Sequence, residues 1–138
     1  MASPELVAAV KVIVGNARAG DRNAAYAGYR SLFSSPGFAA CEPNDKRQAL
    51  RLMVHAKGVP DPPTPPMVEA HRVALPTLER LVKEHGEPGD HEMLGMCQVA
   101  LGNEKAAAET FRAALTIERE RNAQSDLCGT LMKRVSML

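Results

Sequence analysis

Apolar residues recur at three- and four-residue intervals along most of this 138-residue chain, and no segment alternates convincingly between apolar and polar positions. The clearest stripe is Leu75, Leu78, Leu81 and Val82, which share one face of a helix. The pattern therefore predicts an all-α protein. Caps, glycines and prolines divide it into seven predicted helices: about Pro4 to Ala17, from a cap at Asp21 to Phe33, from Asn44 or Asp45 to Gly58, Met67 to Glu84, from a cap at Asp90 to Leu101, Glu104 to about Arg121, and about Ser125 to Met137.

Prolines set the boundaries in the middle of the chain. Five of the eight residues from Val59 to Pro66 are prolines, which excludes a helix interior or a central strand. Residues 59–66 are therefore predicted to form a stiff, extended loop. Pro76 lies inside the predicted Met67–Glu84 helix, so that helix either kinks or begins there.

One spacing occurs twice. A glycine is followed by alanine after four intervening residues, by an aromatic residue after three more, and by Leu or Ala after a further two. The two copies are Gly20, Ala25, Tyr29 and Leu32, and Gly102, Ala107, Phe111 and Ala114, with Leu94-Gly95 upstream of the second. In this spacing the chain resembles the tetratricopeptide repeat (TPR) family, whose unit is 34 residues of helix–turn–helix.

Each position of the second copy has a physical reason. Gly102 permits the sharp turn between paired helices. Gly95 and Ala107 are small, so that the two helices can approach closely, and Phe111 fills the space beside them. The first copy matches less well, because Ile13 stands where Gly95 stands in the second.

The resemblance implies a short right-handed TPR-like solenoid of three antiparallel helix pairs, in a single domain over residues 1–138. The distance from Gly20 to Gly102 is 82 residues, about 14 more than two regular units, and the proline-rich loop takes much of the surplus. The alternative is a generic helical bundle whose spacing matches by chance. The expected parts are repeat 1 at about 4–36, a degenerate repeat 2 at about 43–86, repeat 3 at about 89–121, and a capping helix at about 125–137.

The capping helix is predicted from its own stripe. Leu127, Leu131 and Val135 recur every four residues, which gives this segment one apolar face. Repeat arrays need their last apolar face covered, so the segment is expected to dock near Phe111 and Leu115 of the same chain. The alternatives are a frayed tail and docking into a second copy.

The resemblance also implies a binding surface. In the family, the first helix of each pair lines a concave groove that holds a peptide or a partner helix. The residues that match those positions are Val10, Lys11, Val14, Gln48, Leu52, His55, Glu92, Met96 and Val99. The carboxylate clamp of some members is not expected, because Lys11 and Asn16 are five residues apart rather than four.

Composition narrows the class of partner. Lys and Arg number 17 against 16 Asp and Glu, which gives no case for nucleic acid or an anionic membrane. No stretch approaches the roughly 18 apolar residues of a membrane span. Three separated cysteines form no disulfide framework and fit a reducing compartment, so a cytoplasmic location is predicted.

Residues that could carry chemistry are sparse. His85 and His91 bracket Asp90, but their spacing matches no metal site, and Asp90 is explained as a helix cap. Cys97 is expected to be a small buried residue rather than a nucleophile. Phosphate loops, paired carboxylates and nucleophile elbows are not found, so no catalytic residue, metal or cofactor is predicted. The expected function is a non-enzymatic adaptor, assembly factor or chaperone for a protein or peptide partner, and the alternative is a homodimer formed through apolar helix faces.

Overall fold

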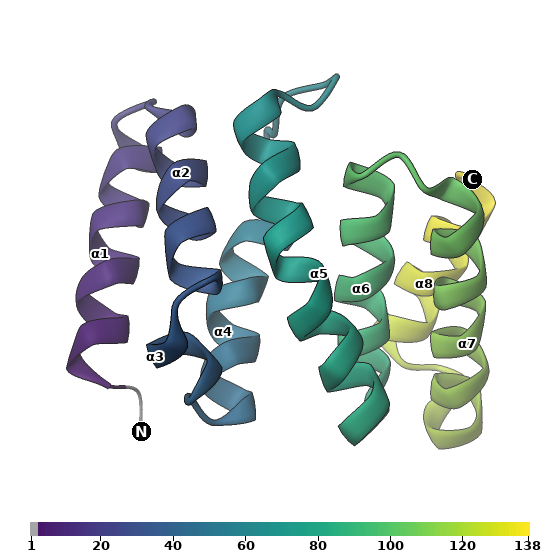
Figure 1. Ribbon diagram of the computed structural model, residues 1–138. Coiled ribbons are helices and arrows are strands. Elements are labelled where there is room, and N and C mark those ends of the chain that lie inside the picture. Colours follow the sequence, from purple (N-terminus) through teal and green to yellow (C-terminus); the bar gives the residue numbers. More distant parts are fainter. Residues whose placement is uncertain (1–2) are drawn as a thin grey trace. The chain divides into compact units, whose positions relative to one another are not determined.

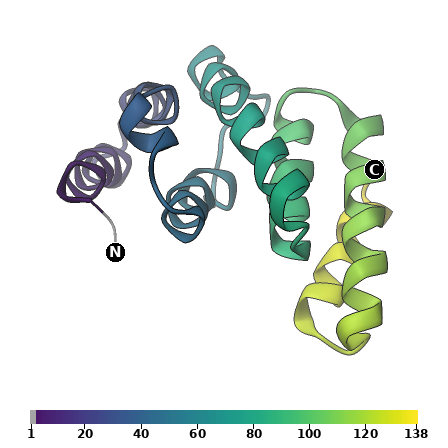
Figure 2. The same cartoon turned by 60° about the horizontal axis from the view of Figure 1, so that its bottom comes forward.

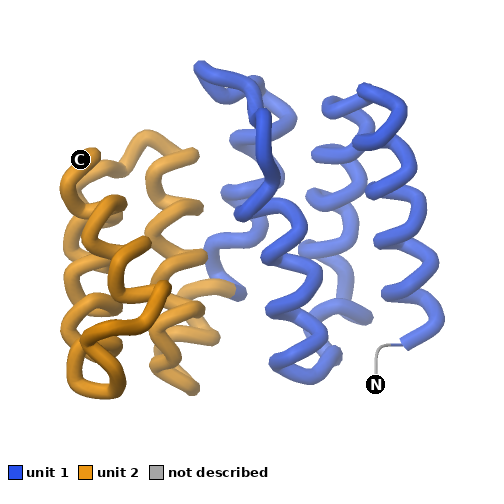
Figure 3. Tube along the Cα trace, turned by 180° about the vertical axis from the view of Figure 1, so that it is seen from behind, with its two compact units in different colours: residues 1–77 blue, residues 78–138 orange. Residues whose placement is uncertain are grey.

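The computed structural model describes residues 3–138, and this part of the chain is all-α, with no strand (Figure 1). The predicted fold class is confirmed at that level. The helices pack antiparallel within two compact units, which comprise the chain up to Thr77 and from Leu78 to Leu138 (Figure 3). The described helices are α1 (Pro4–Arg18), α2 (Arg22–Phe33), α3 (Pro36–Ala39), α4 (Pro43–Val54), α5 (Pro65–His85), α6 (Pro88–Ala100), α7 (Glu104–Asn122) and α8 (Asp126–Ser136).

Side-chain caps fix several of the helix starts. Ser3 accepts a hydrogen bond from the Leu6 amide at α1, and Asp21 accepts one from the Ala24 amide at α2. Ser125 does the same for Cys128 at α8. These caps satisfy amides that have no partner within their own helix, as the sequence predicts at Asp21 and Ser3.

The first unit is built on the hairpin of α1 and α2. Gly20 ends α1 in the left-handed region at φ +85°, which other residues adopt only with strain. Farther along the pair, a Cβ added to Gly28 would lie 2.6 Å from the Ile13 side chain. The bulky residue of this hairpin is therefore on the first helix, and the residue that makes room for it is on the second.

The second unit is built on the hairpin of α6 and α7. Gly102 makes the turn at φ +80°, as predicted. A Cβ at Gly95 would overlap the ring of Phe111, which is buried. Here the small residue lies on the first helix and the bulky one on the second, which is the reverse of the arrangement in the first hairpin.

Both units have a continuous core. In the first, the rings of Tyr26, Tyr29, Phe33 and Phe38 contact one another in succession, and His71 of α5 lies against Tyr26. In the second, Phe111, Ala114 and Leu115 of α7 pack with Cys128 and Leu131 of α8. The predicted position of the C-terminal helix, over Phe111 and Leu115, is confirmed.

The boundaries around α5 differ from the prediction. The proline-rich loop predicted at 59–66 ends at Thr64, because Pro65 and Pro66 form the first turn of α5. Proline is tolerated there since amides in a first turn need no helical acceptor. Pro76 lies inside α5, so the helix does not begin at that residue.

Two other local predictions were wrong. Asp90 does not cap α6: Glu87 holds that position, because Pro88 starts the helix earlier, and Asp90 is buried in the first turn. The third predicted helix begins at Pro43 and ends at Val54, short of Gly58. The predicted end of the second helix at Phe33 is correct, but a short helix that was not predicted, α3, follows it, and its Phe38 is buried.

The closest backbone packing among the described helices joins α1 to α2, α6 to α7 and α7 to α8. The middle pair of the prediction, α4 with α5, does not approach as closely. Two of the three expected antiparallel pairs are therefore tight hairpins.

Candidate functional site

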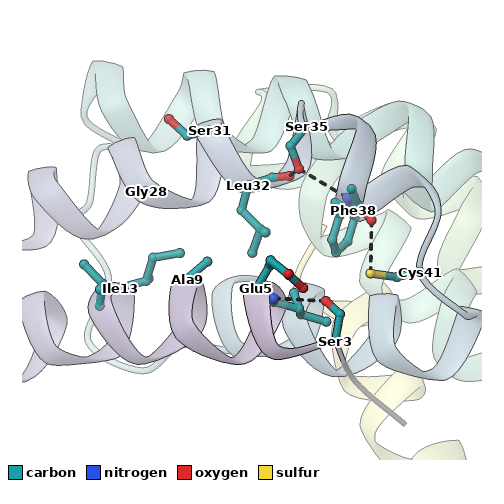
Figure 4. Close-up of a pocket in the computed structure, with 13 residues that line it drawn as sticks. Ser3, Glu5, Ala9, Ile13, Gly28, Ser31, Leu32, Ser35, Phe38 and Cys41 are labelled. Atoms are coloured by element: carbon teal, nitrogen blue, oxygen red, sulfur yellow. Dashed lines mark hydrogen bonds between the residues drawn. The ribbon is translucent and has the colours of Figure 1, made fainter.

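A groove of about 620 Å³ lies in the first unit between α1 and α2, closed at one end by α3 (Figure 4). Gly28 and Ile13 lie at one end, and Phe38 and Cys41 at the other. It is lined by Ser3, Glu5, Leu6, Ala9, Val12, Ile13, Gly28, Ser31, Leu32, Ser35, Gly37, Phe38 and Cys41.

The walls follow from helical spacing. Glu5, Ala9 and Val12 are separated by four and three residues, so they form one line along α1. Ser31 and Leu32 supply the facing wall from the last turn of α2, and Ser35 extends it as the N-cap of α3. Ala9 carries only a methyl group, which leaves space between the two walls, whereas at Gly28 the side chain of Ile13 closes the gap.

Most polar atoms of the groove are already engaged by the backbone. Ser35 Oγ donates to the Leu32 carbonyl at 2.7 Å and accepts from the Phe38 amide at 3.2 Å. Cys41 Sγ donates to the Gly37 carbonyl at 3.3 Å, and Ser3 Oγ caps α1. These atoms have little capacity left for a polar ligand, so the groove is suited to apolar groups.

Glu5 is the one charged residue of the lining. Its carboxylate makes no ion pair or hydrogen bond to any other residue between 3 and 138. The position at the start of α1 is favourable for a negative charge, since the helix dipole is positive there. An anionic ligand is therefore disfavoured beside this residue, and a cationic one is favoured.

The predicted binding residues of the first unit lie elsewhere. Val10, Val14 and His55 are half-buried, whereas Lys11, Gln48 and Leu52 are exposed. None of these six lines the groove. Leu52 is the most open apolar residue among them, at 45% exposure.

In the second unit, α8 lies over two of the three predicted residues. Glu92 is 7% exposed and accepts a hydrogen bond at 2.8 Å from Arg134 Nε of α8. Met96 packs against the cluster that contains Cys128 and Leu131 of the same helix. The prediction that these two residues face an open groove does not fit this placement, because the helix that covers them was expected only near Phe111 and Leu115. Val99 is exposed.

Burial shifts the pKa of the Cys97 and His71 side chains, and a histidine of α6 contacts the backbone. Burial, and secondarily the negative charge of Glu79, raises the pKa of the Cys97 thiol to about 12. Burial lowers the pKa of His71, whose Nδ1 lies 2.8 Å from the Met67 carbonyl. His91 makes the same kind of contact with the Glu87 carbonyl at 3.0 Å. Within residues 3–138, no group of three or more His, Cys, Asp or Glu side chains could hold a metal ion.

The groove could not be found from the sequence, because helical spacing shows which residues share a face but not whether another helix covers that face. That Val12 is exposed while Leu6 and Ile13 of the same helix are buried emerges only from the structure. Among the described helices, none combines the length and apolar character needed to cross a membrane.

Comparison with known proteins adds no relative: no family model matches the chain, and neither does any curated protein or solved structure.

Proposed function

We propose that the chain is a TPR-like helical repeat protein and works as a non-enzymatic protein-binding module, an adaptor, assembly factor or chaperone. The observation that carries this proposal is the apolar groove between α1 and α2, whose polar atoms are largely satisfied by the backbone. Such a surface suits the apolar side chains of a partner peptide or helix better than a polar metabolite.

The repeat assignment is supported by the two glycine turns at Gly20 and Gly102, which lie in the same left-handed conformation. It is also supported by the close helix approach at Gly28 and Gly95. In a TPR-like protein, the first helix of each pair contributes to binding, and exposed Leu52 on α4 fits that role. The nearly balanced charge fits a protein partner in the cytoplasm rather than nucleic acid or a membrane.

The test is an affinity capture with the immobilised chain, followed by mass spectrometry. We expect a defined partner to be retained by the wild-type protein and reduced by Val12→Glu or Leu52→Glu. Val59→Glu is the matched control, because Val59 is also an exposed valine but lies in the proline-rich loop. If no partner were retained, or if all three variants retained it equally, the binding proposal would fail.

The alternative is self-association. It is favoured by the exposed apolar residues at the C-terminal end, where Met132 is 50% and Met137 is 83% exposed. Size-exclusion chromatography with light scattering separates the two functions. A dimer dissociated by Met132→Lys would support self-association, whereas a monomer supports the adaptor.

A further inference from the structure

The two hairpins can be compared residue by residue, because Gly20 and Gly102 make equivalent turns. Val12 of α1 is equivalent to Leu94 of α6, since each lies eight residues before its glycine. Val12 is 65% exposed, whereas Leu94 is 7% exposed. The face that is buried in the second hairpin is therefore open in the first, and this open face is the groove.

A helix accompanies the buried face of the second unit. The last turns of α5, residues 78–85, belong to this unit and lie beside α6 in both views of the ribbon (Figures 1 and 2). Leu78 and Leu81 of that segment are buried, at 0% and 3% exposure. Because the two hairpins are equivalent, we expect the groove of the first hairpin to bind a helix with leucine-like residues three or four positions apart.

The dimensions agree with a short helix. The wall from Glu5 to Ile13 spans eight residues of α1, or about 12 Å at about 1.5 Å per residue. Two helical turns are about 11 Å long. The groove therefore accommodates about two turns of a helix lying along α1 and α2.

The electrostatics indicate the charge of that helix. Glu87 is equivalent to Glu5 and forms an ion pair with Arg121 at 2.8 Å. In the first hairpin α2 already ends at Phe33, and the position counted from Gly20 falls at Ala39 of α3, so Glu5 lacks the partner that Arg121 provides to Glu87. A Lys or Arg of the bound helix would supply the missing cation.

We propose that the groove of the first unit is the seat for an amphipathic helix of a partner protein, with leucine-like residues on one face and a Lys or Arg that pairs with Glu5. This inference rests on the proposed protein-binding function and names the chemistry of the partner. It places the binding site on the side of α1 that carries Glu5, Ala9 and Val12, rather than on Val10, Lys11 and Val14.

The test uses the full chain and two synthetic peptides. Each is a capped 16-residue helical peptide of Ala and Gln, with Leu at positions i, i+3 and i+7; one carries a Lys a turn beyond the last Leu, and the other carries Gln there. We expect saturable binding of the Lys peptide and slower reaction of Cys41 with a thiol reagent when the peptide is bound, because Cys41 lines the groove.

Val12→Glu should weaken binding of the Lys peptide by about 10-fold or more, because it places a charge where an apolar side chain must pack. Val7→Glu is the control, since Val7 is an exposed valine of α1 outside the groove. Glu5→Gln should weaken the Lys peptide by about 3-fold, as expected for an exposed ion pair, and leave the Gln peptide unchanged. Thermal unfolding of each variant verifies that it is folded.

The proposal would be overturned by a lack of binding of the Lys peptide, by equal binding of that peptide to Val12→Glu and wild type, or by self-association of the chain that Val12→Glu abolishes. A partner captured by the wild type and by Val12→Glu but lost in Leu52→Glu would also overturn it, while leaving the protein-binding function intact. If Val12→Glu loses the peptide and the partner while the control variants keep them, both the protein-binding function and the helix-binding groove are supported.

Discussion

At the scale of single residues, close helix contact depends on where a side chain is absent. Gly15 and Gly95 both lie within first helices of hairpins, yet a Cβ at Gly15 would meet no atom within 4 Å, whereas one at Gly95 would overlap the Phe111 ring. The same substitution therefore has opposite expected effects at these two positions.

Gly95→Ala should destabilise the protein by about 1–3 kcal/mol, because Phe111 must move to admit the methyl group. Gly15→Ala should instead stabilise it by about 0.5–1 kcal/mol, since alanine loses less conformational freedom in a helix. Urea denaturation of both variants measures the difference. Equal free energies of unfolding would show that α6 and α7 are not in close contact at Gly95.

The three cysteines should differ in reactivity. Cys97 and Cys128 are buried, whereas Cys41 is half-buried at the end of the groove. Because the thiolate is the reactive form and the pKa of Cys97 is raised to about 12, Cys97 should be inert at pH 8. A thiol-reactive dye should label one cysteine per chain in the native protein and all three in urea. Cys41→Ser should abolish the rapid native labelling; labelling that persists would place another thiol at the surface.

His71 should make the stability of the protein depend on pH. Burial lowers the pKa of His71 in the folded state below the 6.5 of the unfolded chain, so the unfolded chain takes up the proton first. The contribution of His71 to stability is therefore fully present above pH 6.5 and falls as the pH drops through the folded-state pKa. Denaturation between pH 7.5 and 5 should show a steeper loss for wild type than for His71→Gln, and parallel curves would argue against a buried neutral imidazole.

At the scale of secondary-structure elements, α8 contributes to the core of its unit as well as covering it. Leu131 is fully buried, Cys128 nearly so, and Arg134 pairs with buried Glu92 on α6. Deletion of residues 124–138 would expose the apolar faces of Phe111 and Leu115 and leave Glu92 without this partner.

This deletion should cost more than the roughly 2–5 kcal/mol expected for losing a single buried leucine, and it should promote aggregation. Removing only Met137 and Leu138 is the control, because both are exposed. Thermal unfolding and light scattering measure the two effects. A truncated protein as stable and soluble as the full chain would exclude the capping role.

Elements were predictable where local chemistry decides them. Asp21 and Ser3 cap their helices as expected, since nearby residues alone determine a cap. Asp90 was misassigned because Pro88, two residues earlier, is an equally good helix start. The turn at Phe38 was missed because Pro36-Gly37 is typical of a helix end, whereas burial of the ring among neighbouring aromatics favours one more turn.

The candidate site was less predictable than the helices, because it depends on how the helices pack against one another. Helical spacing shows that Val10 and Val14 share one side of the helix and that Val12 lies on another, but not which side another helix covers. Glu92 shows the same limit: its position on α6 follows from spacing, while its pairing with Arg134, 42 residues away, does not.

At the scale of the whole molecule, the near balance of charge predicts how binding responds to salt. The formal net charge is +1, and the groove carries one charged residue. Binding of the Lys helix should thus weaken by no more than about 5-fold between 50 and 500 mM salt, as for one exposed ion pair. Titrations at the two salt concentrations check this; a loss of about 1000-fold, typical of many phosphate contacts, would indicate a polyanionic ligand instead.

The reversed placement of large and small residues in the two hairpins also has a consequence for folding. Similar neighbouring repeats are prone to exchange partners during folding. Here α1 paired wrongly with α7 would bring Ile13 into the space that the Phe111 ring requires. The large residue at position 13 thus disfavours this wrong pairing, so a difference at one position protects the chain against one route of misassembly.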